Sequence, residues 1–166
     1  MNDFIFSYPT KVYFGKDALK KAAAEQLDAF GSNVLLAYGG GSVKRNGIYD
    51  EVMQVLKEHG KHVVEFSGIM SNPTYTKVQE GARLAKENKI DFILAVGGGS
   101  VIDCCKIVAA QAMSEEDIWE MEHSAHRFPQ QAIPMGAIVT ASGTGSEMNG
   151  GAVITNEDLN LKAGMG

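Results

Sequence analysis

Short apolar runs alternate with amphipathic segments along most of this chain. Residues 33–38 (NVLLAY) and 91–96 (DFILAV) are nearly continuous apolar stretches, which is typical of strands covered on both faces of a sheet. Amphipathic patterning between such runs predicts helices, and Asp17 is a plausible N-cap for the first of them. The remaining predicted elements are strands at 62–66 and 133–140 and helices at 17–30, 49–59 and 73–88, with a last helix that follows a turn at 97–99 and runs to about residue 113.

This alternation predicts the fold class and the edge of the sheet at which a ligand binds. Strands that alternate with helices over short loops indicate βαβ units, and therefore an α/β fold with a Rossmann-like parallel sheet. Right-handed crossovers then place helices on both faces. Ligands bind such sheets beyond the carboxyl ends of the strands. Four glycine- or hydroxyl-rich loops are expected there, at 39–42, 67–73, 97–100 and 140–146.

The two ends and one polar stretch are less regular. Residues 4–6 and 11–14 resemble two short strands around Pro9, and 152–155 resembles a last strand. Residues 114–131 predict a helix and an excursion at the edge of the sheet. The final LKAGMG has the composition of a loop, and no linker is visible, so residues 1–166 are interpreted as one domain.

Composition narrows the classes of function. Hydrophobic residues make up 45% of the chain and charged residues 21%, as in ordinary globular proteins. The net charge of -5 and the lack of a Lys/Arg cluster argue against nucleic-acid binding. No apolar run approaches the ~20 residues of a membrane span, and no signal peptide is visible, so cytoplasm is the expected location. The adjacent Cys104 and Cys105 are interpreted as small apolar helix residues.

The segment Gly97-Gly98-Gly99-Ser100 is the strongest candidate binding feature. It joins a predicted strand to a predicted helix, where glycine permits positive φ and lets an anion approach the backbone. Free N–H groups and the helix dipole favour a phosphate there, and Ser100 adds a hydroxyl donor and a cap. The alternative is a tight structural turn. Asp103 and Lys106 follow at i and i+3, and by themselves they favour a surface ion pair.

The segment Gly39-Gly40-Gly41-Ser42 repeats this pattern after another predicted strand. A carboxylate at such a strand end commonly holds ribose hydroxyls and repels a 2′-phosphate. Glycine stands there instead, with Lys44 and Arg45 close behind, which favours NADP over NAD. The alternative is that both cations are solvated surface charges.

The remaining candidates are a hydroxyl-rich loop and the histidines. Residues 140–147 (TASGTGSE) concentrate hydroxyls and glycines after a buried strand, which suits hydrogen bonds to ribose or phosphate oxygens. His123 and His126 form H-x-x-H, but no third ligand stands nearby and the segment is interpreted as exposed. His59 and His62 are interpreted as surface residues, and no activated nucleophile is visible.

Taken together, these motifs resemble the iron-containing, group III alcohol dehydrogenases. The resemblance rests on GGGSVIDCCK (97–106), ASGTGSE (141–147), the Asn72-Pro73 step and PTKVYFG (9–15), in order along the whole chain. GGGSVK at 39–44, with the NG and YD that follow, is similar to the butanol dehydrogenase branch. Dehydroquinate synthase and glycerol dehydrogenase relatives use similar turns, and a stand-alone nucleotide-binding module without catalysis is a third reading.

The resemblance implies an N-terminal α/β domain that binds NAD or NADP and a C-terminal all-helical domain that supplies the metal ligands. That second domain is absent from this sequence, so the chain is interpreted as a fragment of a two-domain enzyme. The implied metal, iron or zinc, is expected only in the longer protein, and none of its ligands is assigned here. The implied substrate is a small alcohol or aldehyde, and a homodimer is allowed but not required.

Residue roles carry over position by position. Gly98, Gly99 and Ser100 match the diphosphate turn, and Asp103 matches an aspartate near the cofactor. Gly39 matches the position where NAD-preferring members carry aspartate.

Five further positions match contacts that the resemblance implies. Asn72 matches an adenosine-side contact, and Lys162 matches a lysine that reaches a ribose. Thr140, Thr144 and Ser146 match the loop at the nicotinamide ribose and diphosphate. The predicted cofactor-binding residues are therefore Gly39, Gly40, Ser42, Asn72, Gly97, Gly98, Gly99, Ser100, Asp103, Thr140, Thr144, Ser146 and Lys162.

Overall fold

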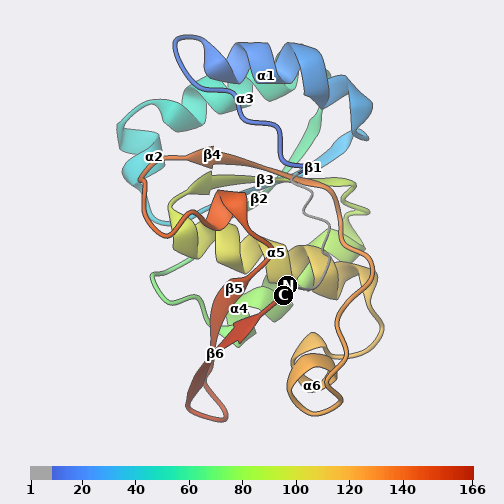
Figure 1. Ribbon diagram of the computed structural model, residues 1–166. Helices are drawn as coiled ribbons and strands as arrows, with labels where there is room; N and C mark the ends of the chain where they lie inside the picture. The colour runs from blue at the N-terminus through green and yellow to red at the C-terminus, as the bar shows by residue number, and fades with distance from the viewer. Residues whose placement is uncertain (1–8) are drawn as a thin grey trace, which may run out of the picture.

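The computed structural model describes residues 9–166 and has a parallel four-stranded sheet at its centre (Figure 1). The strand order is β2-β1-β3-β4. Because all four strands run parallel, their carboxyl ends meet at one edge. The strands are β1 (Asn33–Tyr38), β2 (His62–Phe66), β3 (Phe92–Gly97) and β4 (Met135–Val139).

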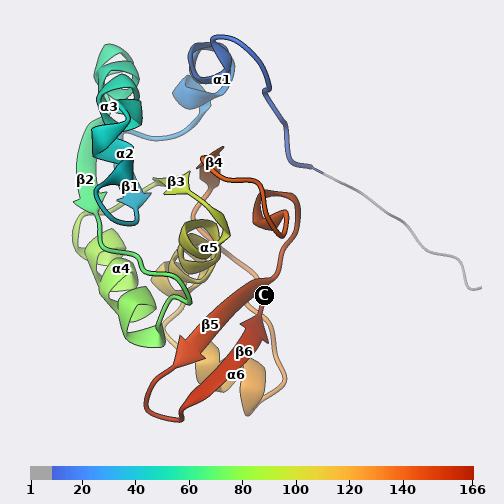
Figure 2. The same cartoon turned by 90° about the vertical axis from the view of Figure 1, so that its left-hand side faces the viewer.

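Helices cover both faces of this sheet, as the alternating pattern predicts (Figure 2). Along β1, Leu35 and Ala37 are buried toward one face while Leu36 and Tyr38 are buried toward the other. One face carries α1 (Ala18–Gln26), η1 (Leu27–Ala29) and α3 (Ile48–Glu58). The other face carries α4 (Tyr75–Glu87) and α5 (Gly99–Met113).

A two-stranded antiparallel hairpin packs against α5 on the side away from the sheet (Figure 2). It consists of β5 (Ala152–Asn156) and β6 (Leu161–Met165), and Ala152 and Ile154 are buried in the core under α5. The prediction of a loop at 161–166 is therefore wrong. The sequence does not indicate this strand, because the small residues Ala163 and Gly164 leave no clear alternation of apolar and polar positions.

Helix α6 (Ile118–His123) is held by a buried polar network rather than by the sheet edge. The Tyr75 hydroxyl donates to Gln111 Oε1 at 3.1 Å and accepts from the Trp119 N–H at 3.1 Å. The N–H of Ile118 also donates to Gln111 Oε1, at 2.9 Å. The predicted helix is confirmed, but its predicted place is wrong, because α6 docks on the α4–α5 layer.

Several predicted boundaries differ from the structure. Residues 11–14 form no strand, and residues 4–6 lie outside the described part of the chain, so the predicted hairpin is not found. Two short helices, α2 (Ser42–Arg45) and η2 (Ser146–Met148), occupy segments expected to be loops. Among residues 9–166, no helix combines the length and the apolar character that crossing a bilayer requires.

Candidate functional site

At the turn before α5, neighbouring side chains leave too little room for a Cβ on two of the three glycines. Gly97 ends β3, Gly98 is the N-cap, and none of the three glycines has positive φ. A Cβ on Gly97 would lie 2.6 Å from Val101 Cγ2, and one on Gly99 would lie 3.0 Å from Ser146 Oγ. Close approach, and not positive φ, therefore requires glycine here. The expected capping role of Ser100 is also wrong, because the N-cap is Gly98, which has no side chain to accept a capping hydrogen bond.

The hydroxyl loop after β4 lies directly against this turn. Thr140 N–H donates to Gly97 O at 3.0 Å, which joins the ends of β3 and β4. Thr144 Oγ1 and Ser146 Oγ are 3.2 Å apart and share a hydrogen bond beside Gly99. Gly145 between them has φ +71, which lets the chain fold back. Two loops predicted separately therefore form one wall.

Asp103 and Lys106 lie on α5 and are nearly enclosed. Their side chains are 14% and 13% exposed, so the interpretation as a surface ion pair is wrong. Asp103 Oδ2 accepts a hydrogen bond from Val153 N–H at 3.0 Å, while Oδ1 is buried and has no hydrogen-bond partner in the described chain. Lys106 Nζ lies 3.9 Å from that Oδ1. Desolvation lowers the pKa of Lys106, partly offset by Asp103.

The hairpin closes the opposite side of the site. Lys162 Nζ on β6 donates to Asn72 Oδ1 at 2.5 Å, which joins residues from distant parts of the sequence. Asn72 has φ +54, a left-handed conformation that asparagine tolerates better than most residues. The N–H of Thr155 donates to Pro73 O at 2.9 Å and fixes the hairpin beside the 67–73 loop.

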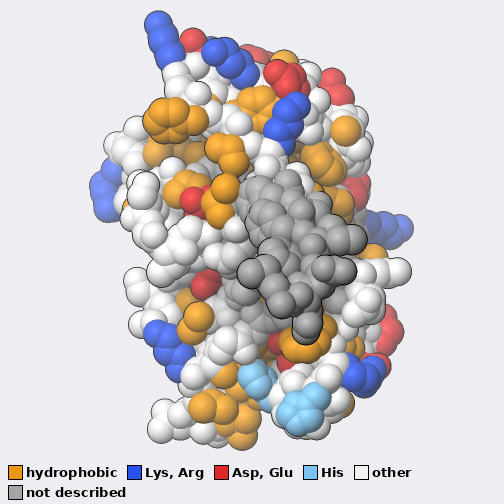
Figure 3. Space-filling view, viewed as in Figure 1, with side chains coloured by type: hydrophobic (Ala, Val, Ile, Leu, Met, Phe, Trp, Pro, Cys, Tyr) orange, Lys and Arg blue, Asp and Glu red, His pale blue; other side chains and the backbone are white. Residues whose placement is uncertain are grey.

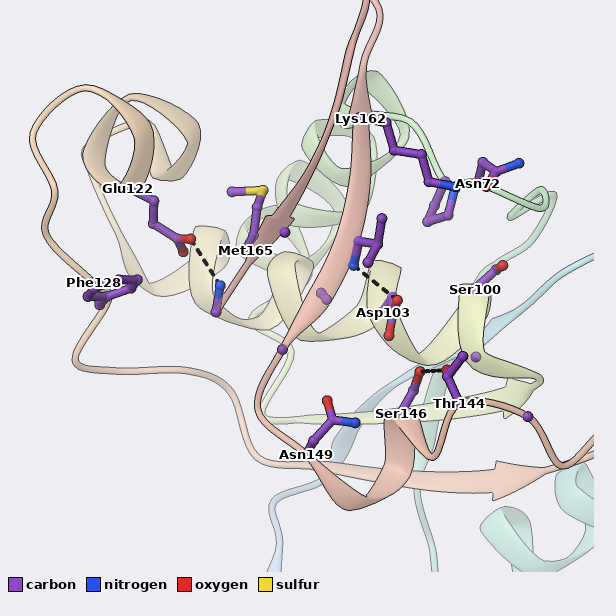
Figure 4. A pocket seen from close by; sticks show the side chains of 18 residues that line it. Asn72, Ser100, Asp103, Glu122, Phe128, Thr144, Ser146, Asn149, Lys162 and Met165 are labelled. Atoms are coloured by element: carbon purple, nitrogen blue, oxygen red, sulfur yellow. Dashed lines mark hydrogen bonds between the residues drawn. The ribbon is translucent and has the colours of Figure 1, made fainter.

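These elements enclose an open pocket of about 790 Å³ (Figure 4). Ser100, Asp103, Thr144 and Ser146 face it from one side, and Lys162 and Asn72 lie at one end. Seven of the thirteen predicted residues line this pocket, so the structure brings together just over half of the predicted set. They are Asn72, Gly99, Ser100, Asp103, Thr144, Ser146 and Lys162.

The other predicted residues lie beside the pocket or on the neighbouring turn. Gly97, Gly98 and Thr140 do not line the pocket, although Thr140 is joined by a hydrogen bond to Gly97 at the adjacent turn. Gly39, Gly40 and Ser42 belong to the turn after β1 and do not line it. A Cβ on Gly39 would lie 3.0 Å from Ile69 O and 3.8 Å from Val101 Cγ2, so the two glycine turns are neighbours.

The cations near the Gly39 turn differ in what they contact. Lys44 Nζ lies 3.5 Å from Glu65 Oε2 and 4.4 Å from the centre of the Tyr49 ring. Tyr49 donates to Glu65 Oε1 at 2.6 Å, and Tyr38 donates to Glu65 Oε2. Arg45 differs, because its Nη1 lies 3.0 Å from the place a Cβ on Gly41 would occupy. Arg45, and not Lys44, therefore reaches over the turn.

The histidines and cysteines offer no metal centre. His123 is half buried against the Trp119 ring at 4.4 Å, so its predicted exposure is wrong, whereas His126 is exposed. His59 Nδ1 lies 2.9 Å from Asp28 Oδ1. Within residues 9–166, no three His, Cys, Asp or Glu side chains are grouped as metal ligands require. Both cysteines are buried as predicted, and burial raises the pKa of Cys104 to about 12.

Some pocket residues were missed by sequence reasoning. Asn149, Gly151 and Val153 line the pocket between η2 and β5, and Glu122 and Phe128 line its far end (Figure 4). Asn149 sits two residues after the predicted hydroxyl loop, so extending that loop would have included it. Glu122 carries no such signal, because only tertiary packing brings α6 to the pocket.

The comparisons with known proteins agree with this arrangement. A family model described as iron-containing alcohol dehydrogenase matches residues 9–166. The chain belongs to the iron-containing alcohol dehydrogenase family. Among solved structures, NADH-dependent butanol dehydrogenase A of Thermotoga maritima superposes with a TM-score of 0.92 at 45% identity, over 99% of this chain and 41% of that one.

Two curated relatives are similar to this chain over nearly its whole length. A probable NADH-dependent butanol dehydrogenase 1 of Bacillus subtilis is 46% identical over 100% of this chain and 42% of its own length. The NADPH-dependent aldehyde reductase YqhD of Escherichia coli is 43% identical over 95% of this chain and 40% of its own length. The chain therefore spans about two fifths of the length of the relatives it matches.

Proposed function

We propose that this chain binds the diphosphate and a ribose of NAD(P)(H) in the pocket at the start of α5. The observation that carries the proposal is the convergence of Ser100, Asp103 and Thr144 on one pocket at the carboxyl edge of the sheet. Pockets in open parallel sheets bind ligands at that edge. The names of the relatives, which include NADH-dependent and NADPH-dependent enzymes, support a nicotinamide cofactor.

The chemistry of the pocket wall suits a dinucleotide. The first N–H groups of a helix have no intrahelical acceptor, so Gly99 and Ser100 offer donors to a diphosphate. The buried Asp103 Oδ1 has no hydrogen-bond partner among the described residues, so it can accept from a ribose hydroxyl. The hydroxyls of Thr144 and Ser146 add further donors beside the turn.

In this proposal the longer protein is a metal-dependent oxidoreductase that acts on a small alcohol or aldehyde. The bound nicotinamide supplies hydride transfer to or from the carbinol carbon. The contribution of this chain is to bind and orient that cofactor. The residues that the structure describes do not fit a metal site, so no step is assigned to them through a metal.

The Gly39 turn supports a preference for NADP over NAD. Gly39 provides no carboxylate to repel a 2′-phosphate, and Arg45 places a guanidinium over Gly41. Lys44, which the sequence also suggested, is already paired with Glu65. We therefore expect Arg45 to be the cation that favours the additional phosphate.

On the face shown in Figure 3, Lys and Arg side chains are scattered among acidic ones. Nothing on the described part of this face gathers positive charge as a nucleic-acid surface does. This distribution supports a small-molecule ligand.

The proposal is tested by titrating NADPH and NADH into the 166-residue chain while following nicotinamide fluorescence. We expect saturable binding of both, tighter for NADPH, and no oxidation of butanol by this chain. Isothermal calorimetry with the same preparation serves as a second measure of affinity. If neither cofactor binds up to about millimolar concentration, the proposed function is wrong.

A further inference from the structure

Lys106 is a nearly enclosed cation that lies behind the wall of the pocket. Its side chain is 13% exposed, and it is not among the residues that line the pocket. Its Nζ donates to Gly151 O at 2.6 Å and to Asn149 Oδ1 at 3.1 Å. These bonds use two of the three N–H groups of the ammonium, and the Asp103 carboxylate lies 3.9 Å away, so Lys106 is engaged mainly with the protein behind the pocket wall.

The groups that Lys106 holds all face the pocket. Asn149, Gly151 and Asp103 line it, and they come from two segments that are far apart in sequence (Figure 4). Asn149 and Gly151 are otherwise exposed residues between η2 and β5. Charge-assisted hydrogen bonds are stronger than neutral ones, so Lys106 restrains a segment that has few other constraints.

We infer that Lys106 is a positioning residue for cofactor binding: it fixes Asn149 and the 149–151 backbone against α5, beside Asp103. This inference rests on the proposed function, because it assumes that the pocket holds the dinucleotide. Asn149 has a second restraint, since its Nδ2 donates to Gly145 O at 2.8 Å. Lys106 thereby couples the hydroxyl loop, the start of β5 and α5 into one wall.

A double-mutant cycle tests this inference. Lys106→Met, Asn149→Ala and the double variant are compared by NADPH titration and by amide hydrogen exchange at residues 149–153. We expect each single variant to bind NADPH about tenfold more weakly. The double variant should lose less than the sum of the two single losses, because both single variants remove the bond between Lys106 and Asn149. Exchange at 149–153 should be faster in Lys106→Met.

Two further variants separate positioning from a general loss of stability. Lys57→Met removes an exposed lysine on α3 and should leave NADPH affinity unchanged. If Lys106→Met does not fold, Lys106→Gln keeps a donor without the charge and should show an intermediate loss of affinity. The inference is overturned if Lys106→Met binds NADPH within twofold of the affinity of the original chain. It is also overturned if the two single losses of affinity add in the double variant. If the unsubstituted chain binds no cofactor, the proposed function fails first and the inference fails with it.

Discussion

The same five residues, Gly-Gly-Gly-Ser-Val, occur at the carboxyl ends of β1 and β3, yet they build two different structures. After β3, the segment 97–101 opens a helix of 15 residues and forms part of a pocket. After β1, the segment 39–43 opens a helix of 4 residues and stays largely exposed. The two segments are identical only as far as the valine, so the residues that follow and the surroundings of each turn cause the difference.

Those surroundings differ in kind. The Gly97 turn is enclosed by packing, because Val101, Ser146 and Thr144 stand within contact distance of its glycines. At the Gly39 turn, a Cβ on Gly40 would meet nothing within 4 Å, and a Cβ on Gly41 would meet only Arg45. Beside that turn, Glu65 joins two tyrosines and Lys44. The enclosed turn is therefore suited to hold a diphosphate, and the exposed turn to distinguish one end of the cofactor.

The largest expected effect comes from a substitution at the third glycine of the Gly97 turn. Gly99→Val places a side chain against Ser146 Oγ and Thr144 Oγ1, which would lie 3.0 and 3.4 Å from the Cβ. We expect NADPH to bind at least about a hundredfold more weakly, because the wall must move into the space of the cofactor. Gly41→Val is the matched control, since it meets only the mobile end of Arg45 and should cost far less. Equal losses in NADPH titrations of the two variants would contradict the comparison.

The next prediction concerns cofactor preference. Gly39→Asp adds a carboxylate at the end of β1, where it can hold ribose hydroxyls and repel a 2′-phosphate. We expect the ratio of NADPH to NADH affinity to fall by about tenfold. The new Cβ would lie 3.0 Å from the Ile69 carbonyl oxygen, which must shift by a few tenths of an ångström. Gly39→Ala has the same crowding without the charge and serves as the control. Affinity ratios that match in the aspartate and alanine variants would show that charge at this position plays no part.

A third prediction compares the stability of the two turns at their first glycine. Gly97→Ala would place Cβ 2.6 Å from Val101 Cγ2 and 2.9 Å from Val101 Cβ, which side-chain rotation cannot relieve. We expect a loss of about 1–3 kcal/mol in the free energy of unfolding. Gly39→Ala should lose less, because its closest neighbour is 3.0 Å away. Urea unfolding of both variants measures this, and the account is wrong if Gly39→Ala is the more damaging change.

The smallest expected effect is a dependence of stability on pH at the Gly39 turn. Hydrogen bonds from Tyr38 and Tyr49 hold the pKa of Glu65 below its usual 4.5. A carboxylate with a lowered pKa stabilises the fold at neutral pH, and this stabilisation is lost as pH falls through the folded pKa. We therefore expect the chain to be more stable than Glu65→Gln at neutral pH, and the gap to close in acid.

Thermal unfolding between about pH 7 and pH 3 measures that gap. A gap between the original chain and Glu65→Gln that stays constant across this range would mean that the carboxylate does not stabilise the turn.

Sequence patterns predicted the sheet and its helices because buried parallel strands produce continuous apolar runs. The patterns missed β6, because its small and exposed residues do not alternate between apolar and polar. They misplaced α6, because the hydrogen-bond network of Tyr75, Gln111 and Trp119 forms only in the folded chain. The pocket was predicted through its loops, since strand ends share an edge. Lys106 was not predicted as a positioning residue, because an i, i+3 pair does not reveal that a hairpin will cover it.

In the proposed function, the Gly97 turn, and not the Gly39 turn alone, holds the cofactor diphosphate. Amide chemical-shift mapping of the chain during an NADPH titration tests it most directly. We expect saturable shifts at Gly98, Gly99 and Ser100, with further shifts at Thr144 and Ser146. Shifts confined to residues 39–45, or no shifts at saturating cofactor, would contradict it.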